Sequence, residues 1–188
     1  MMAPAVRPLT AGGLESLRVL LSDEGGLIAT LVAPAAGNGA AEGSPPTPAA
    51  LAAEGPRAEG RREDYELLIE AIYEGYLLHY GAPRVLEVPE ADLGLLAGDH
   101  LYAIGLARLV DLGDTLAVAE LADMITLSAL AQGSGDTELA DAVWTAGARA
   151  VGWGPSEAHR RAKDLMVRGA AGALEAMRTS AAGSAGAP

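Results

Sequence analysis

The chain has 188 residues, half of them apolar, with a formal net charge of −12 and no cysteine. This length and composition predict one domain with ample material for a buried core and room for an appended segment. The acidic charge argues against binding to nucleic-acid phosphates or to an anionic membrane surface, and the missing thiols exclude disulfides, thiolate metal sites and cysteine nucleophiles.

The N-terminal third predicts a small helical segment and then a linker. Helical spacing of apolar residues predicts a short helix over 14–21, which two glycines interrupt. The apolar run 27–32 is too short for periodicity to separate a strand from a helix. Residues 34–60 consist mainly of Ala, Gly, Pro, Ser and Glu, a composition that predicts a flexible linker.

From residue 61 onward, apolar residues recur at helical spacing and no useful strand-like alternation follows. Glycine, proline and capping residues divide this stretch into helices, with Asp114 and Ser156 as expected N-caps. The predicted helices are 61–80, 89–110, 114–132, 136–152 and 156–177, the last interrupted near 169–172. The sequence therefore predicts an all-α antiparallel bundle. Its expected parts are a helical segment at 1–33, a linker at 34–60, a helical domain at 61–179 and a disordered tail at 180–188.

No targeting or membrane segment is expected. The first ten residues lack the apolar centre of a signal peptide. No segment is expected to supply the roughly 18–20 apolar residues that a membrane span needs. The predicted location is therefore the cytoplasm.

Three glutamates, Glu66, Glu70 and Glu74, are spaced four residues apart and share one face of a predicted helix. Clustered carboxylates can hold Mg²⁺ against a substrate phosphate. The periodicity by itself favours a solvated stripe opposite the apolar face. Asp99 lies within the otherwise apolar helix 95–107, where a carboxylate must be partnered or close to an opening. A structural role is expected there, with the end of a neighbouring helix, Arg108 or Arg84 as its partner.

Two further charged groups occur later in the chain. Glu120 and Asp123, at i and i+3, could in principle ligate a metal, but no Glu-x-x-His motif accompanies them as a dimetal bundle would need. A basic cluster follows, and it is expected to form a solvated helix face. Its members are His159, Arg160, Arg161 and Lys163.

Residues 95–111 resemble the helix that follows the first Asp-rich motif of all-α polyprenyl diphosphate synthases. The sequence Leu-Ala-Gly-Asp at 96–99 matches a stretch common in that family. A Gly-x-Pro element at 81–83 stands where the family usually carries Arg-Arg-Gly-x-Pro. In the same register, the family's Asp-Asp-x-x-Asp metal motif falls on residues 70–74.

The sequence departs from the family pattern at the residues that bind metal and diphosphate in that family. Glu70 and Glu74 replace the outer carboxylates of the metal motif, and Ala71 replaces the middle one. The paired arginines are replaced by His79 and Tyr80, neither of which can supply a bidentate grip on diphosphate. The second Asp-rich motif has no counterpart. The resemblance leaves two sets of candidate residues, which are degenerate metal positions at Glu70, Glu74 and Asp99, and an anion-binding pair, His79 and Arg84.

The resemblance therefore implies a non-catalytic accessory subunit of a two-component polyprenyl diphosphate synthase, built as a truncated isoprenoid-synthase bundle. Its partner would be a catalytic synthase subunit or a second copy of the chain, and it would need no cofactor. One alternative is a Mg²⁺-dependent enzyme acting on a phosphorylated or isoprenoid substrate, and another is an unrelated helical adaptor. The relationship requires helix 91–110 to pack antiparallel to 64–80, with Glu70 and Glu74 facing a cavity.

Overall fold

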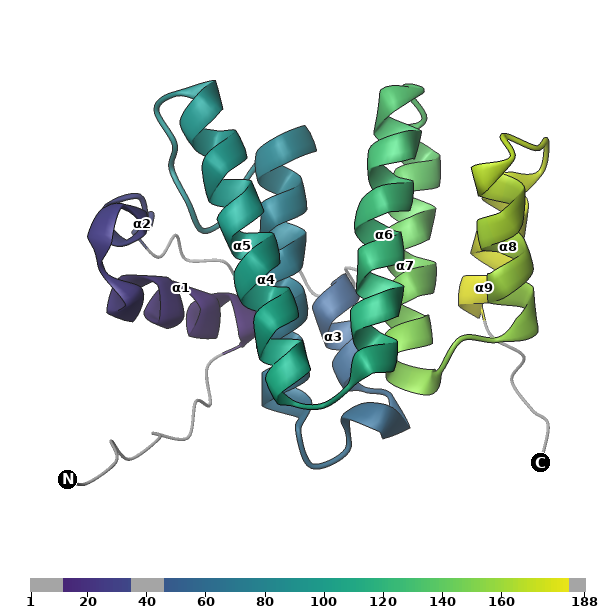
Figure 1. Ribbon diagram of the computed structural model, residues 1–188, viewed down its shortest axis with the longest axis horizontal. Helices are drawn as coiled ribbons and strands as arrows, with labels where there is room; N and C mark the ends of the chain where they lie inside the picture. The colour runs from purple at the N-terminus through teal and green to yellow at the C-terminus, as the bar shows by residue number, and fades with distance from the viewer. Residues whose placement is uncertain (1–11, 35–45, 183–188) are drawn as a thin grey trace.

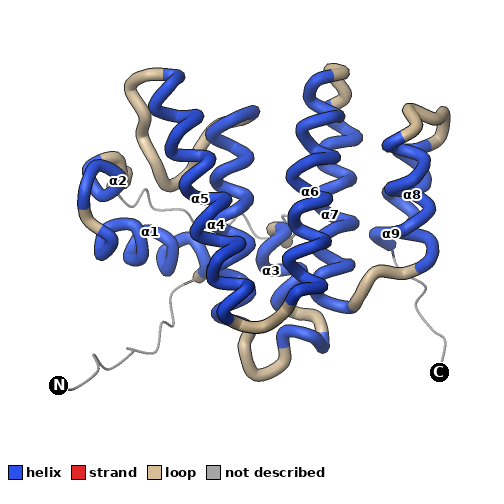
Figure 2. Tube along the Cα trace, in the orientation of Figure 1, coloured by secondary structure: helices blue, strands red, loops and turns tan. Residues whose placement is uncertain are grey.

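The computed structural model describes residues 12–34 and 46–182. Within those ranges the regular structure is helical, apart from one isolated bridge between Val32 and Leu86, so the predicted all-α class is confirmed (Figure 2). The elements are α1 (Gly13–Glu24), α2 (Gly26–Thr30), α3 (Pro48–Ala53), the 3-10 turn η1 (Pro56–Ala58), α4 (Arg62–Tyr80), α5 (Ala91–Asp111), α6 (Thr115–Gly133), α7 (Thr137–Trp153), α8 (Glu157–Val167) and α9 (Ala173–Ala182).

Helix hairpins stand side by side in the fold (Figure 1). The α4–α5 pair is antiparallel, because the short connection 81–90 reverses the chain, and α6–α7 and α8–α9 form the next two pairs. The short helix α3 lies between α4 and α7 and contacts both. Helix α1 crosses the other side of α4.

The main core lies where these hairpins meet, and aromatic rings fill its centre. The chain has no phenylalanine, so tyrosine and tryptophan supply this bulk. The ring of Trp144 lies 4.8 Å from that of Tyr73 and 5.1 Å from that of Tyr76, between centroids. These contacts join α4 to α7 across the molecule.

The prediction of a flexible linker is wrong for its second half, residues 46–60. Residues 46–60 contain α3 and η1, and Ala49 and Ala52 are fully buried between α4 and α7. Thr47 caps α3 by accepting the N–H of Ala50 at 3.2 Å. An Ala-rich segment has little apolar surface of its own, but its small side chains fit a narrow space between two larger helices. The first half of the linker, residues 35–45, lies outside the described residues.

The predicted separation of an N-terminal piece is also wrong. Leu17 and Leu21 of α1 are fully buried in a second core cluster with residues of α4 and α5. The buried side chain of Arg18 donates to the carbonyl oxygens of Ala33 at 2.5 Å and Arg84 at 2.7 Å. The ambiguous run 27–32 is mainly the short helix α2. One helical body therefore contains residues 12–34 as well, and residues 1–11 of the predicted segment lie outside the described residues.

The predicted tail likewise begins too early. Helix α9 continues to Ala182, and Ser180 is buried, with its hydroxyl donating to the carbonyl oxygen of Met177 at 2.8 Å. Residues 183–188 lie outside the described residues.

Two helices, α5 and α6, are long and apolar enough to cross a membrane by length and composition, which the sequence reading did not expect. Core helices of soluble proteins pass the same test. In this fold only 33% of the apolar stretch of α5 is buried and 39% of that of α6. Part of the apolar surface of α5 is therefore left without a covering helix.

Candidate functional site

The strongest cluster of charges joins α4 to the loop that follows it. The guanidinium of Arg84 donates to Glu70 Oε2 at 2.6 Å and to Glu74 Oε2 at 3.2 Å. Glu74 Oε1 also accepts the backbone N–H groups of Arg84 and Val85, both at 2.6 Å. The two glutamates lie one helical turn apart, so a single arginine folded back from the loop can reach both.

The expected solvated stripe is wrong for these two residues. Glu70 is 2% exposed and Glu74 is 0% exposed. Thr47, at the start of α3, donates its hydroxyl to Glu70 Oε1 at 3.1 Å. Periodicity could not show this burial, because α1 and α3 cover α4 from distant parts of the sequence and the 81–90 loop folds back onto it.

One cation serves two buried carboxylates in this cluster. Burial raises the pKa of Glu70 above its usual value, and the charge of Glu74 adds to the rise. The charge and hydrogen bond of Arg84 and the hydroxyl of Thr47 oppose it. The guanidinium also lies over the ring of Tyr73, 4.9 Å from its centroid, in a cation–π contact. The cluster thus anchors the loop to α4 with its polar atoms directed at one another.

The third candidate metal position lies apart from this pair. The Asp99 side chain is 70% exposed, so the expected buried partnership with Arg108 or Arg84 is wrong. Its Oδ1 atom lies 3.3 Å from Nε2 of His79, whose ring stacks on Tyr102 at 5.4 Å between centroids. Asp99 therefore lies on an exposed face of α5. Across residues 12–34 and 46–182, no three His, Asp or Glu side chains converge as a metal-binding group.

The candidate anion-binding pair is engaged within the protein. Arg84 binds the two buried glutamates, and His79 contacts Asp99 and Tyr102. Helix α5 does lie antiparallel to α4, as the family relationship requires. Glu70 and Glu74 do not meet the second requirement, because they face Arg84 and the loop backbone instead of a cavity.

A second buried charge cluster was missed by the sequence reading. Nζ of Lys163 donates to Glu120 at 2.9 Å and to Asp123 at 2.7 Å. Nε2 of His159 lies 3.1 Å from Glu120 Oε2, and its Nδ1 lies 3.4 Å from the hydroxyl of Ser180. The cluster fastens the α8–α9 hairpin to α6.

The predicted solvated basic face is therefore wrong for His159 and Lys163, although Arg160 and Arg161 are exposed as expected. The spacing of these charged residues in the sequence could have indicated the cluster. His159 and Lys163 are four residues apart on one helix face, and Glu120 and Asp123 are three apart on another. Only the packing of α8 against α6 brings these two faces together.

Acid should weaken the attachment of α8 to α6. Burial by itself raises the pKa of Glu120, but hydrogen bonds from His159 and Lys163 outweigh it and hold that pKa below the usual 4.5. The folded state thus favours the ionised carboxylate, so its stabilisation is present above pH 4.5 and is lost as pH falls further. We expect Glu120→Gln to lower the free energy of unfolding at pH 7 by about 2 kcal/mol.

Urea unfolding of both proteins at pH 7, 5, 4 and 3 measures this difference. It should be largest at pH 7 and should shrink below pH 4.5. A difference that stays constant across this range would show that the charge of Glu120 has no part in holding the hairpin.

The start of α6 confirms the predicted N-cap. Asp114 Oδ1 accepts the N–H of Ala117 at 3.0 Å and binds Nη2 of Arg57 at 2.7 Å. The hydroxyl of Tyr65 donates to the same carboxylate. Burial and this carboxylate together raise the pKa of Tyr65 to about 12. The cap therefore also ties α6 to α4 and η1.

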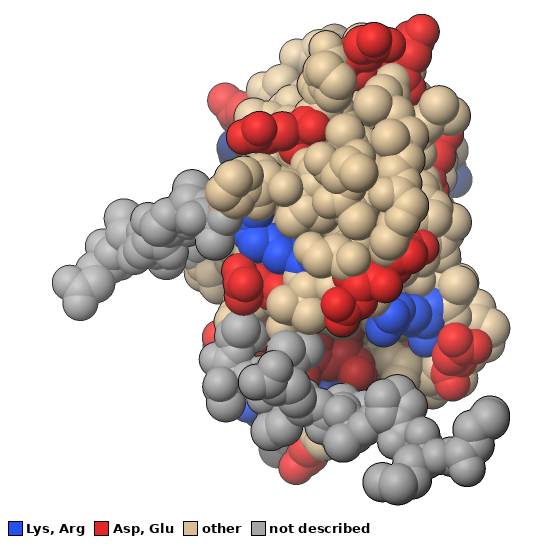
Figure 3. Space-filling model, turned by 90° about the vertical axis from the view of Figure 1, so that its left-hand side faces the viewer, with Lys and Arg blue, Asp and Glu red and all other residues tan. Residues whose placement is uncertain are grey.

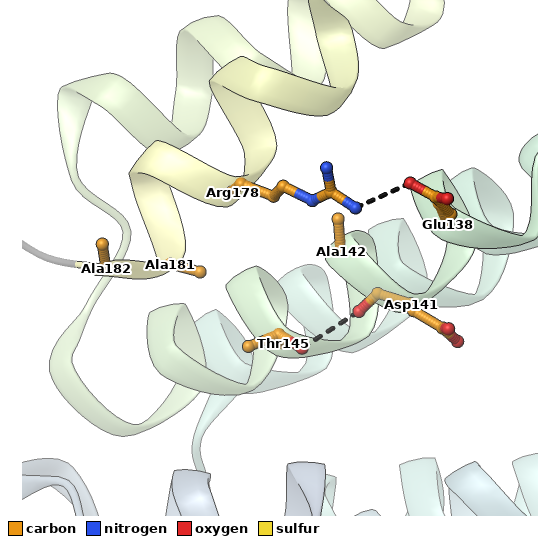
Figure 4. Close-up of a pocket in the computed structure, with 7 residues that line it drawn as sticks. All are labelled: Glu138, Asp141, Ala142, Thr145, Arg178, Ala181 and Ala182. Atoms are coloured by element: carbon orange, nitrogen blue, oxygen red, sulfur yellow. Dashed lines mark hydrogen bonds and ion pairs between the residues drawn. The ribbon is translucent and has the colours of Figure 1, made fainter. Parts of the chain in front are cut away.

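A surface hollow lies between α7 and α9 (Figure 4). An ion pair bridges it, because Nη2 of Arg178 donates to Oε2 of Glu138 at 2.8 Å, and both side chains are exposed. The side chain of Asp141 points away from Arg178 in the same view. Among the described residues that line the hollow, the charged groups of Arg178 and Glu138 are paired with each other.

The most prominent uncovered surface follows α5. Leu95, Leu96 and Val110 are exposed, as are Ala103 and Ala107 between them on the helix. The side of the molecule that carries α2 and α5 shows a broad uncharged area with both acidic and basic side chains around its edges (Figure 3). This is the type of surface at which another helix can pack.

Comparisons with known proteins find no relative of this chain. No protein-family model, no curated protein and no solved structure matches it.

Proposed function

We propose that this chain is a non-catalytic helical subunit that acts by helix–helix association with a catalytic partner. The observation that carries the proposal is the contrast between its charges and its apolar surface. Glu70 and Glu74 are occupied by Arg84, whereas the outer face of α5 is left uncovered. Charged groups that are satisfied internally stabilise a scaffold, and an exposed apolar helix face stabilises a complex.

The proposed partner class comes from the sequence. The register between Gly81 and Asp99 resembles that of polyprenyl diphosphate synthases, so the partner would be a catalytic subunit of such a synthase. The antiparallel packing of α4 and α5 meets one of the two structural requirements of that resemblance, whereas Glu70 and Glu74, bound by Arg84, do not meet the other. In this role the chain would change the length of the product that its partner makes, in the cytoplasm.

Co-purification with the polyprenyl synthases encoded in the same genome tests this role. We expect one of them to form a stable complex with this chain and to release a product of different length when bound. The chain alone, supplied with Mg²⁺ and allylic and homoallylic diphosphates, should form no product. Failure of every such synthase to associate would contradict the proposal. Calorimetric Mg²⁺ binding that disappears in Glu70→Gln/Glu74→Gln would favour the enzyme alternative.

A further inference from the structure

An apolar groove runs along α5 beside α1 and α2. Its first part, of about 370 Å³, is lined mainly by leucine and isoleucine of α2 and α5. Its second part continues along α5 and is lined by Leu20, Ile104 and Ala107 with charged residues at its edge. Glu24 lines both parts, so they form one continuous surface, which we call the α5 groove.

The length of the α5 groove suits one helix. The α5 residues that line it extend from Leu93 to Ala107 at helical spacing. At 1.5 Å per residue this stretch spans about 21 Å, or about four helical turns. Leu27 is 63% exposed and Leu96 is 67% exposed, so the groove presents large side chains that water alone covers. Burial of such side chains is the main source of affinity when an amphipathic helix binds in a groove.

Charge determines which kind of helix fits. Asp23 and Glu24 border the groove. Arg108 is the cation at this border, and Nε2 of His100 already lies 3.0 Å from Glu24. The whole chain carries a net charge of −12, so a second copy would bring the same charge to the same surface. A helix with basic flanks would be attracted instead.

We infer that the α5 groove binds an amphipathic helix that has leucine-like residues on one face and Lys or Arg on its flanks. The inference rests on the proposed function, because it names the surface and the chemistry through which the catalytic partner would be held. The apolar face of the incoming helix covers Leu27 and Leu96, and its basic flanks lie against Asp23 and Glu24.

A synthetic 18-residue amphipathic helix with a leucine face and lysine flanks is the probe. Fluorescence anisotropy measures its binding to the full chain, and a matched peptide with glutamate in place of lysine is the control. We expect the basic peptide to bind at least tenfold more tightly. Leu27→Gln/Leu96→Gln should weaken its binding at least tenfold, whereas Val167→Gln, at a 68% exposed position on α8, should change it less than twofold.

Several outcomes would overturn the inference. One is equal binding of the two peptides, and another is unchanged peptide binding by the double variant. A third is that the wild-type chain self-associates or binds phosphatidylcholine vesicles and that the double variant does neither. Circular dichroism confirms that the variants fold. A catalytic synthase subunit that binds the wild type and the double variant equally leaves the proposed function intact and rejects the groove. If the chain binds the basic peptide but no synthase, the inference about the groove stands and the proposed partner class is contradicted.

Discussion

Replacement of Arg84 by methionine should lower the free energy of unfolding by about 3–5 kcal/mol, the cost of leaving buried charges without their partner. The side chain of Arg84 contacts Glu70 at 2.6 Å and Glu74 at 3.2 Å, and both carboxylates are almost fully buried. Methionine keeps much of the volume but removes the cation. Urea unfolding followed by circular dichroism measures the loss.

Arg178→Met is the matched control. Arg178 and Glu138 form an exposed ion pair at 2.8 Å, so the expected loss is below about 1 kcal/mol. The deficit of Arg84→Met should shrink in acid. Without the guanidinium, burial keeps the pKa of Glu70 raised, so folding favours its protonated form and the penalty falls as pH drops. Equal losses for the two arginine variants would mean that the Glu70–Glu74–Arg84 cluster adds nothing to stability.

Replacement of Gly55 by alanine should destabilise the fold by about 3 kcal/mol through overpacking. A Cβ atom at Gly55 would lie 2.2 Å from the carbonyl oxygen of Gly152, and its other nearest neighbours are also backbone atoms of α7. Backbone cannot move aside as the end of a flexible side chain can. The backbone of Gly55 has a φ of −70°, which alanine adopts freely, so the effect would come from this contact alone.

Gly133→Ala tests the same substitution where space is open. No atom lies within 4 Å of the position a Cβ would take there, and the residue ends α6. Alanine favours the helix over glycine, so the stability should stay unchanged or rise by up to about 1 kcal/mol. Thermal unfolding of both variants separates the two cases. A Gly55→Ala protein as stable as the wild type would show that the turn between α3 and η1 does not rest closely on α7.

The sequence by itself determined the class of the fold and most of its helices. Apolar spacing marked α4 to α8, and capping residues located their starts, with Asp114 and Ser156 each accepting a backbone N–H as predicted. These features depend on residues close together in the chain, so local rules are enough to find them. The same local rules did not predict the ordered structure of residues 46–60, because this order depends on packing against α4 and α7 and not on the segment's own composition.

Only the tertiary structure decided the roles of the charged residues. Glu70, Glu74 and Glu120 share the helical spacing of exposed glutamates, yet each is buried against a cation from another element. Asp99, in the most apolar surroundings of the sequence, is exposed instead. A repeat of 3.6 residues shows which side chains share a helix face, but the elements packed on that face determine whether it meets water, a neighbouring helix or a partner.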